Sequence, residues 1–428
     1  MLLLIYALVG YGVSNKALCK ILIQLGHKVF VSEARALNEE ERKELFALGV
    51  EFEENGNSNK ILQADWIVVS PSVKPDHPII SHALERVLTD LDVALNIEKP
   101  GFIIGITGTN GKTTTCHMFE HAMSRLGKKV MVAGNVGNPI SNVLGQRLDY
   151  LVLELSSFQL FWAKSLPIDV GLILNIEPNH LDWHPSFEHY VESKLKLFTF
   201  AKDRYIHKDC EAVIRSKGYS VRFFSPIQTV KENEIEFRGK IYPSRNDLLK
   251  TYQNQQNLSA VLTVMEFLGF EPNEVLNALE DFRPPHHRME LVASIDGVQF
   301  VNDSKSTSAA ATIAALENYS DGRVVLILTG RGKNENYDPL IKQIKKKVKH
   351  VVVFGEIRSR IVPLLKESNV PFCVVENMEQ AVLAAFKSAS FGDVVLLSPA
   401  AASFDLYSSY AERGEHFVRV VKFFQEGR

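Results

Sequence analysis

A glycine-rich segment directly after an apolar strand constrains this chain more than any other feature. Residues 102–106 form a short apolar run, and residues 105–115 read GITGTNGKTTT. Glycines allow the backbone to turn so that successive N–H groups point at one anion, and the N-terminus of a following helix adds partial positive charge. This order of strand, loop and helix predicts a phosphate-binding loop inside an α/β domain.

The loop residues suggest how a nucleoside triphosphate would be held. Lys112 is expected to balance the charge of the β- and γ-phosphates, and Thr113 to offer its hydroxyl to Mg²⁺. The common motif has a glycine five places before that of the Gly-Lys pair, where this chain has Ile106. The predicted ATP contacts in the loop are Gly108, Thr109, Asn110, Gly111, Lys112, Thr113 and Thr114.

Periodicity along the chain indicates the fold class and the domain organisation. The 428 residues are too many for one ordinary core. Short apolar runs alternate with helical patterns, which is typical of parallel sheets with crossover helices. We expect an α/β fold of three domains: a Rossmann-like domain at 1–97, a central P-loop-type ATPase domain at 98–283 and a Rossmann-like domain at 284–428. Alternation between about 225 and 243 predicts a small β excursion in the second domain.

Composition argues against several classes of protein. The 48 basic and 50 acidic side chains nearly balance, so nothing indicates a nucleic-acid partner. The four cysteines lie far apart without a CxxC pair, which fits a reducing cytoplasm. The apolar start lacks a basic segment before it and a small-residue cleavage site after it, so we interpret it as a buried first strand. No other stretch approaches the roughly 18 apolar residues that span a bilayer, and we expect no membrane insertion.

Two polar side chains follow strands of the predicted central sheet. Glu154 ends one strand, and His180 lies after the next one in NIEPNHLDWH. Ligands of open α/β sheets bind at the carboxyl ends of the strands. A carboxylate and a neutral imidazole are suitable ligands for a Mg²⁺ ion that phosphate oxygens already hold, although His is an uncommon Mg²⁺ ligand. Taken singly, a helix cap and an ordinary loop histidine are the favoured interpretations, and Asp182 and His184 are rival candidates.

Six short motifs in one order resemble the Mur ligase family over essentially the whole chain. They are the phosphate loop, LELSSFQ, NIEPNHLD, NDSKST, TGRGKN and LLSPAAASFD. NDSKST with LSPAAASFD is similar to the members that join D-glutamate to UDP-N-acetylmuramoyl-L-alanine through an acyl phosphate in peptidoglycan precursor synthesis. The resemblance implies a domain for the UDP moiety, a central ATPase that needs ATP and Mg²⁺, and a C-terminal domain for the incoming amino acid. We expect a cytoplasmic monomer.

The resemblance also implies roles for individual residues. Catalytic roles fall to Lys112, His180 and Lys194, and Lys194 matches a lysine that becomes carbamylated. The implied metal ligands are Thr113, Glu154, His180 and Lys194. The implied contacts to the UDP-sugar are Val13, Ser14, Arg35, Asn135 and Ser156. Further ATP contacts are Asn257, Arg288 and Asp303, and D-glutamate is received by Thr307, Lys333, Ser403 and Tyr410.

Alternatives remain open at this stage. Ser308 and Tyr410 stand where the family more often has asparagine and phenylalanine, which leaves fine contacts undecided. A sister ligase or a folate-type glutamate ligase would add a different amino acid. A nicotinamide dehydrogenase would use Gly10 and Gly12, but Asn15 stands where its fingerprint has a small residue. A nucleotide-dependent switch without catalysis is the remaining alternative.

Overall fold

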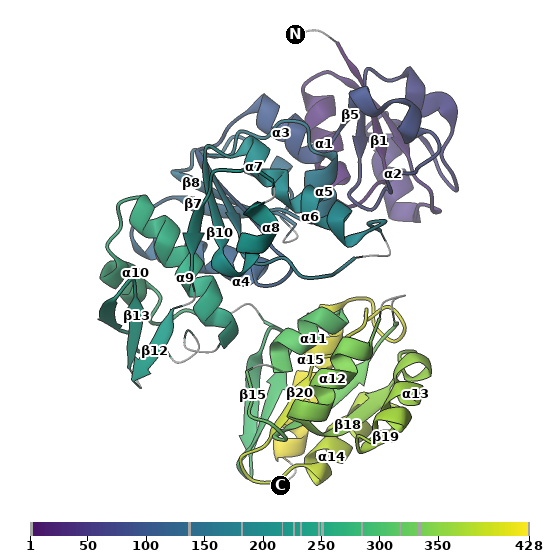
Figure 1. The fold of residues 1–428 in the computed structure, drawn as a ribbon. Helices are drawn as coiled ribbons and strands as arrows, with labels where there is room; N and C mark the ends of the chain where they lie inside the picture. The colour runs from purple at the N-terminus through teal and green to yellow at the C-terminus, as the bar shows by residue number, and fades with distance from the viewer. Residues whose placement is uncertain are drawn as a thin grey trace. The chain divides into compact units, whose positions relative to one another are not determined.

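The computed structural model describes most of the chain as α/β structure (Figure 1). The described residues are 3–135, 138–180, 183–215, 217–225, 227–231, 233–246, 249, 252–283, 286–316, 318–332 and 336–426. The chain divides into two compact units. The first comprises Met1–Ile176, Trp183–Ser225 and Ser259–Leu279, and the second Glu177–Asp182, Pro226–Leu258 and Glu280–Arg428.

The first sheet of the first unit has five parallel strands in the order β3-β2-β1-β4-β5. Strands β1 and β2 each bury four of their five residues, as expected for short apolar strands in a parallel sheet. Helix α2 begins with a capping box between Asn38 and Glu41. The elements are β1 (Ile5–Val9), α1 (Val13–Gln24), β2 (Lys28–Ser32), α2 (Glu39–Ala47), β3 (Glu51–Glu53), β4 (Trp66–Val69), β5 (Val87–Leu88) and α3 (Asp90–Ile97).

The second sheet of this unit has six parallel strands in the order β11-β10-β9-β6-β8-β7. Its strands are β6 (Phe102–Thr107), β7 (Val130–Gly134), β8 (Tyr150–Glu154), β9 (Val170–Ile173), β10 (Asp203–His207) and β11 (Arg222–Phe224). Its helices are α4 (Lys112–Arg125), α5 (Ser157–Trp162), α6 (Phe187–Leu195), α7 (Leu197–Phe200), α8 (Glu211–Arg215) and α10 (Pro272–Ala278), while α9 (Tyr252–Phe267) contributes to both units.

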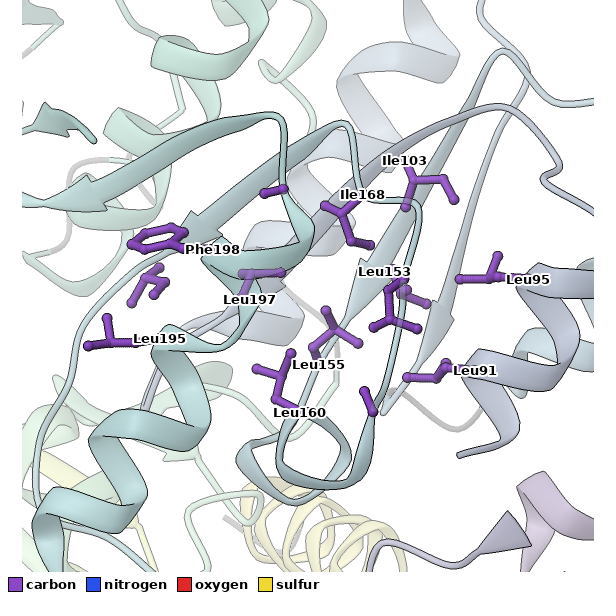
Figure 2. Packing of buried hydrophobic residues seen from close by; sticks show 14 of the residues in the cluster. Leu91, Leu95, Ile103, Leu153, Leu155, Leu160, Ile168, Leu195, Leu197 and Phe198 are labelled. Atoms are coloured by element: carbon purple, nitrogen blue, oxygen red, sulfur yellow. The ribbon is translucent and has the colours of Figure 1, made fainter. Parts of the chain in front are cut away.

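Buried aliphatic side chains hold helices against this six-stranded sheet (Figure 2). Ile103 of β6 and Leu153 of β8 are fully buried in one cluster with Leu91 of α3 and Leu197 of α7. A Cβ at Gly105 would lie 3.1 Å from Leu197 Cδ1, so the glycine in β6 leaves room for α7 to pack closely. The residues that carry the phosphate loop therefore start from a rigid strand.

The second unit contains a three-stranded antiparallel sheet and a six-stranded sheet in the order β15-β16-β20-β17-β18-β19. β15 is antiparallel to β16 and the other pairs are parallel. The small sheet consists of β12 (Gln228–Lys231), β13 (Glu234–Phe237) and β14 (Lys240–Pro243). The larger one consists of β15 (Glu290–Ile295), β16 (Val298–Asn302), β17 (Val324–Thr329), β18 (Val348–Phe354), β19 (Phe372–Val374) and β20 (Val394–Leu397), with helices α11 (Ala309–Leu316), α12 (Asp338–Lys347), α13 (Arg358–Ser368), α14 (Met378–Ser388) and α15 (Tyr410–Glu426).

These sheets confirm the predicted α/β class and the β excursion. The apolar runs at 150–154, 298–302 and 394–397 each predict a strand from the sequence alone, and the observed β8, β16 and β20 have the same bounds. Strands β3, β5, β7, β10, β11 and β15 were not predicted. Among the described residues, β15 is a half-exposed edge strand that pairs with β16. The domain boundaries at 97 and 283 stay a prediction. Among the described residues, no helix combines the length and apolar character needed to cross a membrane.

The core of the six-stranded sheet leads to a stability prediction. Leu153→Ala should lower the free energy of unfolding by about 2–5 kcal/mol, because the fully buried side chain leaves a cavity against neighbours that relax only partly. Denaturant unfolding followed by circular dichroism measures this difference. Leu84→Ala, at a position 48% exposed, is the matched control and should change it by about 0.5 kcal/mol or less. Equal effects of the two substitutions would contradict the packing described for Leu153.

Candidate functional site

The glycine-rich loop between β6 and α4 is held by an asparagine at the end of the neighbouring strand β9. Asn175 accepts hydrogen bonds from Thr109 N at its carbonyl oxygen (3.0 Å) and from Asn110 N at Oδ1 (2.8 Å), and its Nδ2 donates to Asn110 O (3.2 Å). Gly111 has a φ of 81° and caps α4, a conformation that favours glycine. These hydrogen bonds attach the loop to the end of the neighbouring strand.

Lys112 folds its side chain back over this loop. Its Nζ donates to the carbonyl oxygens of Gly108 (2.8 Å) and Thr109 (2.9 Å). The first turn of α4 contains no acidic residue, so the positive end of the helix dipole is not compensated there. Ammonium, loop N–H groups and helix N-terminus together suit an anion such as a phosphate group.

Glu154 joins the ends of β7, β8 and α4. Its Oε2 accepts from Thr113 Oγ1 (2.7 Å) and its Oε1 from Asn135 Nδ2 (2.8 Å), while the side chain is 2% exposed. A Cβ at Gly134, whose φ is 98°, would lie 2.3 Å from Glu154 O, so only glycine permits this close approach. A carboxylate beside a hydroxyl forms an all-oxygen donor set that suits Mg²⁺. The structure thus brings together Thr113, Glu154 and Asn135 of the predicted site residues.

Lys194 of α6 is buried against the same loop. Its Nζ donates to Gly108 O (2.8 Å) and lies 3.4 Å from Thr107 Oγ1 and 4.7 Å from the centre of the Tyr190 ring. Burial lowers the pKa of Lys194 well below its ordinary value, the charge of Lys112 acts in the same direction, and Glu154 acts against them. The charged form of Lys194 is therefore disfavoured at this position beside the phosphate loop.

The rival candidate His184 is engaged in a buried cluster of its own. Its Nε2 lies 2.9 Å from Ser157 Oγ and its Nδ1 2.8 Å from His189 Nδ1, and its ring stacks on Phe158. Burial lowers the pKa of His184 to about 4, and the charges of His189 and Lys194 act the same way. His184 is therefore neutral at neutral pH, with both ring nitrogens in contact with partners.

The remaining central candidates are placed as follows. His180 adopts a φ of 56° and its backbone N–H donates to Asn179 Oδ1 (2.8 Å); it belongs to the second compact unit. The rival Asp182 lies outside the described residues. Thr114 is buried in α4, and Ser156 accepts from Gln159 N (3.2 Å) as the N-cap of α5.

A cavity of about 520 Å³ opens at the carboxyl ends of β1, β2 and β4 in the first sheet. The lining residues are Val9, Gly10, Glu33, Ala34, Asn57, Ser72, Val73, Lys74, Asp76, His77 and Pro78. Its position at the ends of parallel strands is where α/β sheets bind ligands. Within the lining, His77 Nε2 lies 3.1 Å from Asn57 Oδ1.

The predicted contacts to the UDP-sugar near this cavity have other neighbours. Val13 is exposed at the start of α1, and the hydroxyl of Ser14 is hydrogen-bonded to the buried carboxyl group of Asp90. The Arg35 guanidinium donates to both carboxylate oxygens of Glu41, each at 2.8 Å. None of the three lines the cavity, so their roles stay a prediction.

In the second unit, Asp303 follows β16 and is almost fully buried. Its Oδ2 accepts from Ser398 Oγ (2.9 Å) and its Oδ1 from Met289 N (3.3 Å). Burial raises the pKa of Asp303 to about 6, because its effect is larger than the lowering of the pKa by the hydrogen bonds from Ser306 and Ser398 and by the charge of Arg288. Arg288 is half-buried beside this carboxyl group, so the structure brings these two candidates together.

Of the residues predicted to receive D-glutamate, Thr307 and Ser403 lie on loops of the same sheet and Tyr410 is the first residue of α15. Thr307 and Tyr410 are half-buried and Ser403 is buried, and Lys305 Nζ lies 3.8 Å from the centre of the Tyr410 ring. Lys333 lies outside the described residues. Asn257 is buried in α9, with its Nδ2 3.5 Å from Asn254 Oδ1.

Sequence reasoning missed several residues that shape the central site. Tyr190 places its hydroxyl 2.9 Å from Thr109 Oγ1 and its ring beneath Lys194 Nζ. Its spacing of four from Lys194 on one helix was a usable signal, because residues i and i+4 share a face. Asn175 carried a similar signal as a polar residue just after the apolar strand β9. The cavity residues Lys74 and His77 carried no such sequence signal, since they lie in an irregular loop.

Comparisons with known protein families match three consecutive segments of the chain. The MurD N-terminal domain matches residues 6–79, the Mur ligase middle domain residues 106–263, and the Mur ligase, glutamate ligase domain residues 287–401. The three segments occur in the order that the six motifs predicted.

Known proteins resemble the chain over its whole length. The UDP-N-acetylmuramoylalanine--D-glutamate ligase of Pseudothermotoga lettingae is 52% identical over 420 residues, 97% of this chain and 98% of that protein. The UDP-N-acetylmuramate-alanine ligase of Thermotoga maritima superposes with a TM-score of 0.60 at 20% identity, covering 99% of this chain and all of that one. The MurF ligase of Thermotoga maritima, solved in complex with ADP, has a TM-score of 0.59 at 16% identity over 94% of this chain and 96% of that one.

The histidine cluster predicts how stability depends on pH. Between pH 6.5 and 4 the unfolded chain binds a proton at His184 that the folded chain does not bind, because the folded pKa is about 4 and the unfolded value about 6.5. The stabilisation is complete above pH 6.5 and is lost as the pH falls toward 4, by at most about 3 kcal/mol. His184→Gln should flatten this dependence in denaturant unfolding between pH 7.5 and 4.5. His82→Gln, at an exposed position, is the control, and an unchanged slope in His184→Gln would contradict the prediction.

Proposed function

Since the chain belongs to the Mur ligase family, we propose that it joins D-glutamate to UDP-N-acetylmuramoyl-L-alanine with consumption of ATP in peptidoglycan synthesis. The observation that carries the reaction type is the phosphate loop with Lys112 above it and the Thr113–Glu154 pair at its end. The choice of substrates follows the name of the relative from Pseudothermotoga lettingae.

Amide formation from a free carboxylate needs activation, because a carboxylate oxygen is a poor leaving group. The carboxylate of the UDP-linked alanine attacks the γ-phosphorus of ATP, and ADP leaves as an acyl phosphate forms. The amino group of D-glutamate, after losing a proton, attacks the acyl carbon, and inorganic phosphate departs. The first step brings negative groups together, so the residues around the phosphates must neutralise charge.

Lys112 and the loop N–H groups are the chain's own means of neutralising this charge. The ammonium lies over the carbonyl oxygens of Gly108 and Thr109, at the positive end of α4. Thr113 and Glu154 would hold Mg²⁺, which would supply positive charge to offset the negative groups that this step brings together. Asn135 orients the Glu154 carboxylate through its Nδ2 hydrogen bond. His180 is proposed as a further metal ligand.

Lys194 is proposed to act as its carbamate, the adduct of a neutral amine with CO₂. The depressed pKa of Lys194, caused first by burial, favours the neutral amine that reacts with CO₂. An ammonium near Glu154 would repel a cation, whereas a carbamate offers an oxygen anion as a ligand. The modification would therefore reverse the sign of this buried side chain.

The remaining features belong to the same proposal. We place the domains at 1–97, 98–283 and 284–428, and we propose a cytoplasmic monomer. The proposed contacts to the UDP-sugar are Val13, Ser14, Arg35, Asn135 and Ser156. The proposed nucleotide contacts are Asn257, Arg288 and Asp303, and the proposed D-glutamate contacts are Thr307, Lys333, Ser403 and Tyr410. The dehydrogenase alternative is disfavoured by Asn15, which stands where the dinucleotide fingerprint has a small residue and whose Nδ2 donates to Gly10 O at 2.8 Å.

The first functional prediction concerns Lys112. The purified protein should form ADP only when UDP-N-acetylmuramoyl-L-alanine and D-glutamate are both present, measured by a coupled ADP assay with mass detection of the amide. Lys112→Ala should lower the rate by at least about 10³-fold, because a charge aimed at the transferred phosphoryl group is lost. An unchanged thermal midpoint would show that the variant is folded. Turnover with another amino acid in place of D-glutamate would assign the chain to a sister ligase, and near-normal turnover by Lys112→Ala would contradict the site.

The second functional prediction concerns Lys194. Lys194→Ala should lose activity, and acetate added at millimolar concentration should restore part of it by occupying the vacated anionic position. Acetate should not restore Lys112→Ala, which serves as the control for a nonspecific effect of the salt. Full activity of Lys194→Ala without any additive would be incompatible with a carbamate at this position. A mass spectrum of the native protein lacking a labile CO₂ adduct, together with absent rescue, would lead to the same conclusion.

A further inference from the structure

The last helix, α15, carries a guanidinium that is completely buried in the C-terminal part of the second unit. Arg413 is 0% exposed. Its Nε donates to Ser304 Oγ (3.0 Å) and its Nη2 to Ser304 O (2.8 Å), while its Nη1 donates to Thr329 O (3.2 Å) and to Ala401 O (3.1 Å). A buried charge is costly unless its donors are satisfied, and here neutral oxygens satisfy them. Such an arrangement needs a specific reason to exist.

The acceptors of this guanidinium lie at the ends of three adjacent strands. Ser304 follows β16, Thr329 ends β17 and Ala401 follows β20, and these strands are neighbours in the sheet order β16-β20-β17. A Cβ at Gly330 would lie 2.7 Å from Arg413 Nη1 and 2.2 Å from Ala402 O, so glycine is required for the close approach of the second loop. One side chain therefore sets the spacing of three loops.

Two of these loops carry residues proposed to receive the amino acid. Thr307 comes three residues after Ser304, and Ser403 two residues after Ala401. Tyr410 lies on α15 itself, one helical turn before Arg413, and its carbonyl oxygen accepts from Ser304 Oγ (2.8 Å). The Ser304 hydroxyl thus links the guanidinium to the start of α15.

We propose that Arg413 is a positioning residue for the amino-acid site: without touching substrate, it holds the three loops and the start of α15 at the spacing that D-glutamate requires. This inference rests on the proposed function. A lysine cannot replace the arginine, because an ammonium has three donors on one atom and lacks the planar fork that reaches separated carbonyl groups. Burial lowers the pKa of Arg413 to about 10, against the nearby charge of Asp405, so the group stays cationic at neutral pH.

The test compares Michaelis constants in the coupled ADP assay of the full chain. Arg413→Lys should raise the KM for D-glutamate at least about tenfold and leave the KM for UDP-N-acetylmuramoyl-L-alanine within about twofold, because the loops that Arg413 holds carry residues proposed to contact D-glutamate and none proposed to contact the UDP-sugar. Leu365→Ala, at a fully buried position on α13 of the same sheet, is the control for destabilisation. It should lower the thermal midpoint but leave the KM for D-glutamate unchanged.

Ser304→Ala gives a second, gentler test that does not remove the buried charge. It deletes the hydroxyl between Arg413 and Tyr410, and a smaller rise in the KM for D-glutamate is expected, with no rise in the KM for UDP-N-acetylmuramoyl-L-alanine. It decides the question if Arg413→Lys does not fold. Equal rises in the KM for D-glutamate and for UDP-N-acetylmuramoyl-L-alanine, or a rise in Leu365→Ala matching that in Arg413→Lys, would reduce Arg413 to a purely structural role and overturn the inference. If the wild type uses another amino acid, the proposed function fails, while the KM for that amino acid still tests the role of Arg413.

Discussion

The hydrogen bond between Thr113 and Glu154 is the contact on which the central site depends. It joins the first turn of α4, the helix that begins at the phosphate loop, to the end of β8, the strand next to the edge strand β7. The carboxylate is almost fully buried, so both of its oxygens need hydrogen-bond donors. Thr113 donates to Oε2, and Asn135 Nδ2 donates to Oε1. Three separate segments are thereby held at one point, where the proposed metal would carry the charge of the reaction.

Lys194 and Arg413 are two buried basic side chains, and their surroundings offset the cost of burying a charge in different ways. Lys194 has a carbonyl oxygen and an aromatic ring as neighbours and the ammonium of Lys112 nearby, so its charged form is disfavoured. Arg413 spreads its donors over three backbone carbonyl oxygens and a hydroxyl, and it keeps its charge. The proposals assign the first arrangement to a chemical modification and the second to the spacing of loops. Both follow from how many acceptors the surrounding loops provide.

The prediction of the fold was most accurate where the signal is local. Fully buried strands such as β20 are continuous apolar runs bounded by polar turns, and they were predicted to the residue. The half-exposed edge strand β15 was missed, because its pairing with β16 depends on a partner that the run itself does not reveal. The loop residues Lys74 and His77 were missed because the cavity they line exists only after three strands have been placed side by side.

The sequence by itself determined the class of fold, the phosphate loop and the order of the six motifs, because strand, turn and helix signals are contained within a few neighbouring residues. Only the tertiary structure decided that Thr113 bonds to Glu154, 41 positions away, and that Asn175 holds the loop from 65 positions away. It alone showed that Lys194 is buried and that Arg413 bonds to Ser304, 109 positions away. Burial and long-range hydrogen bonds arise from tertiary packing, which brings together residues that are far apart in the sequence. The local sequence around each residue does not show which distant residue it will contact.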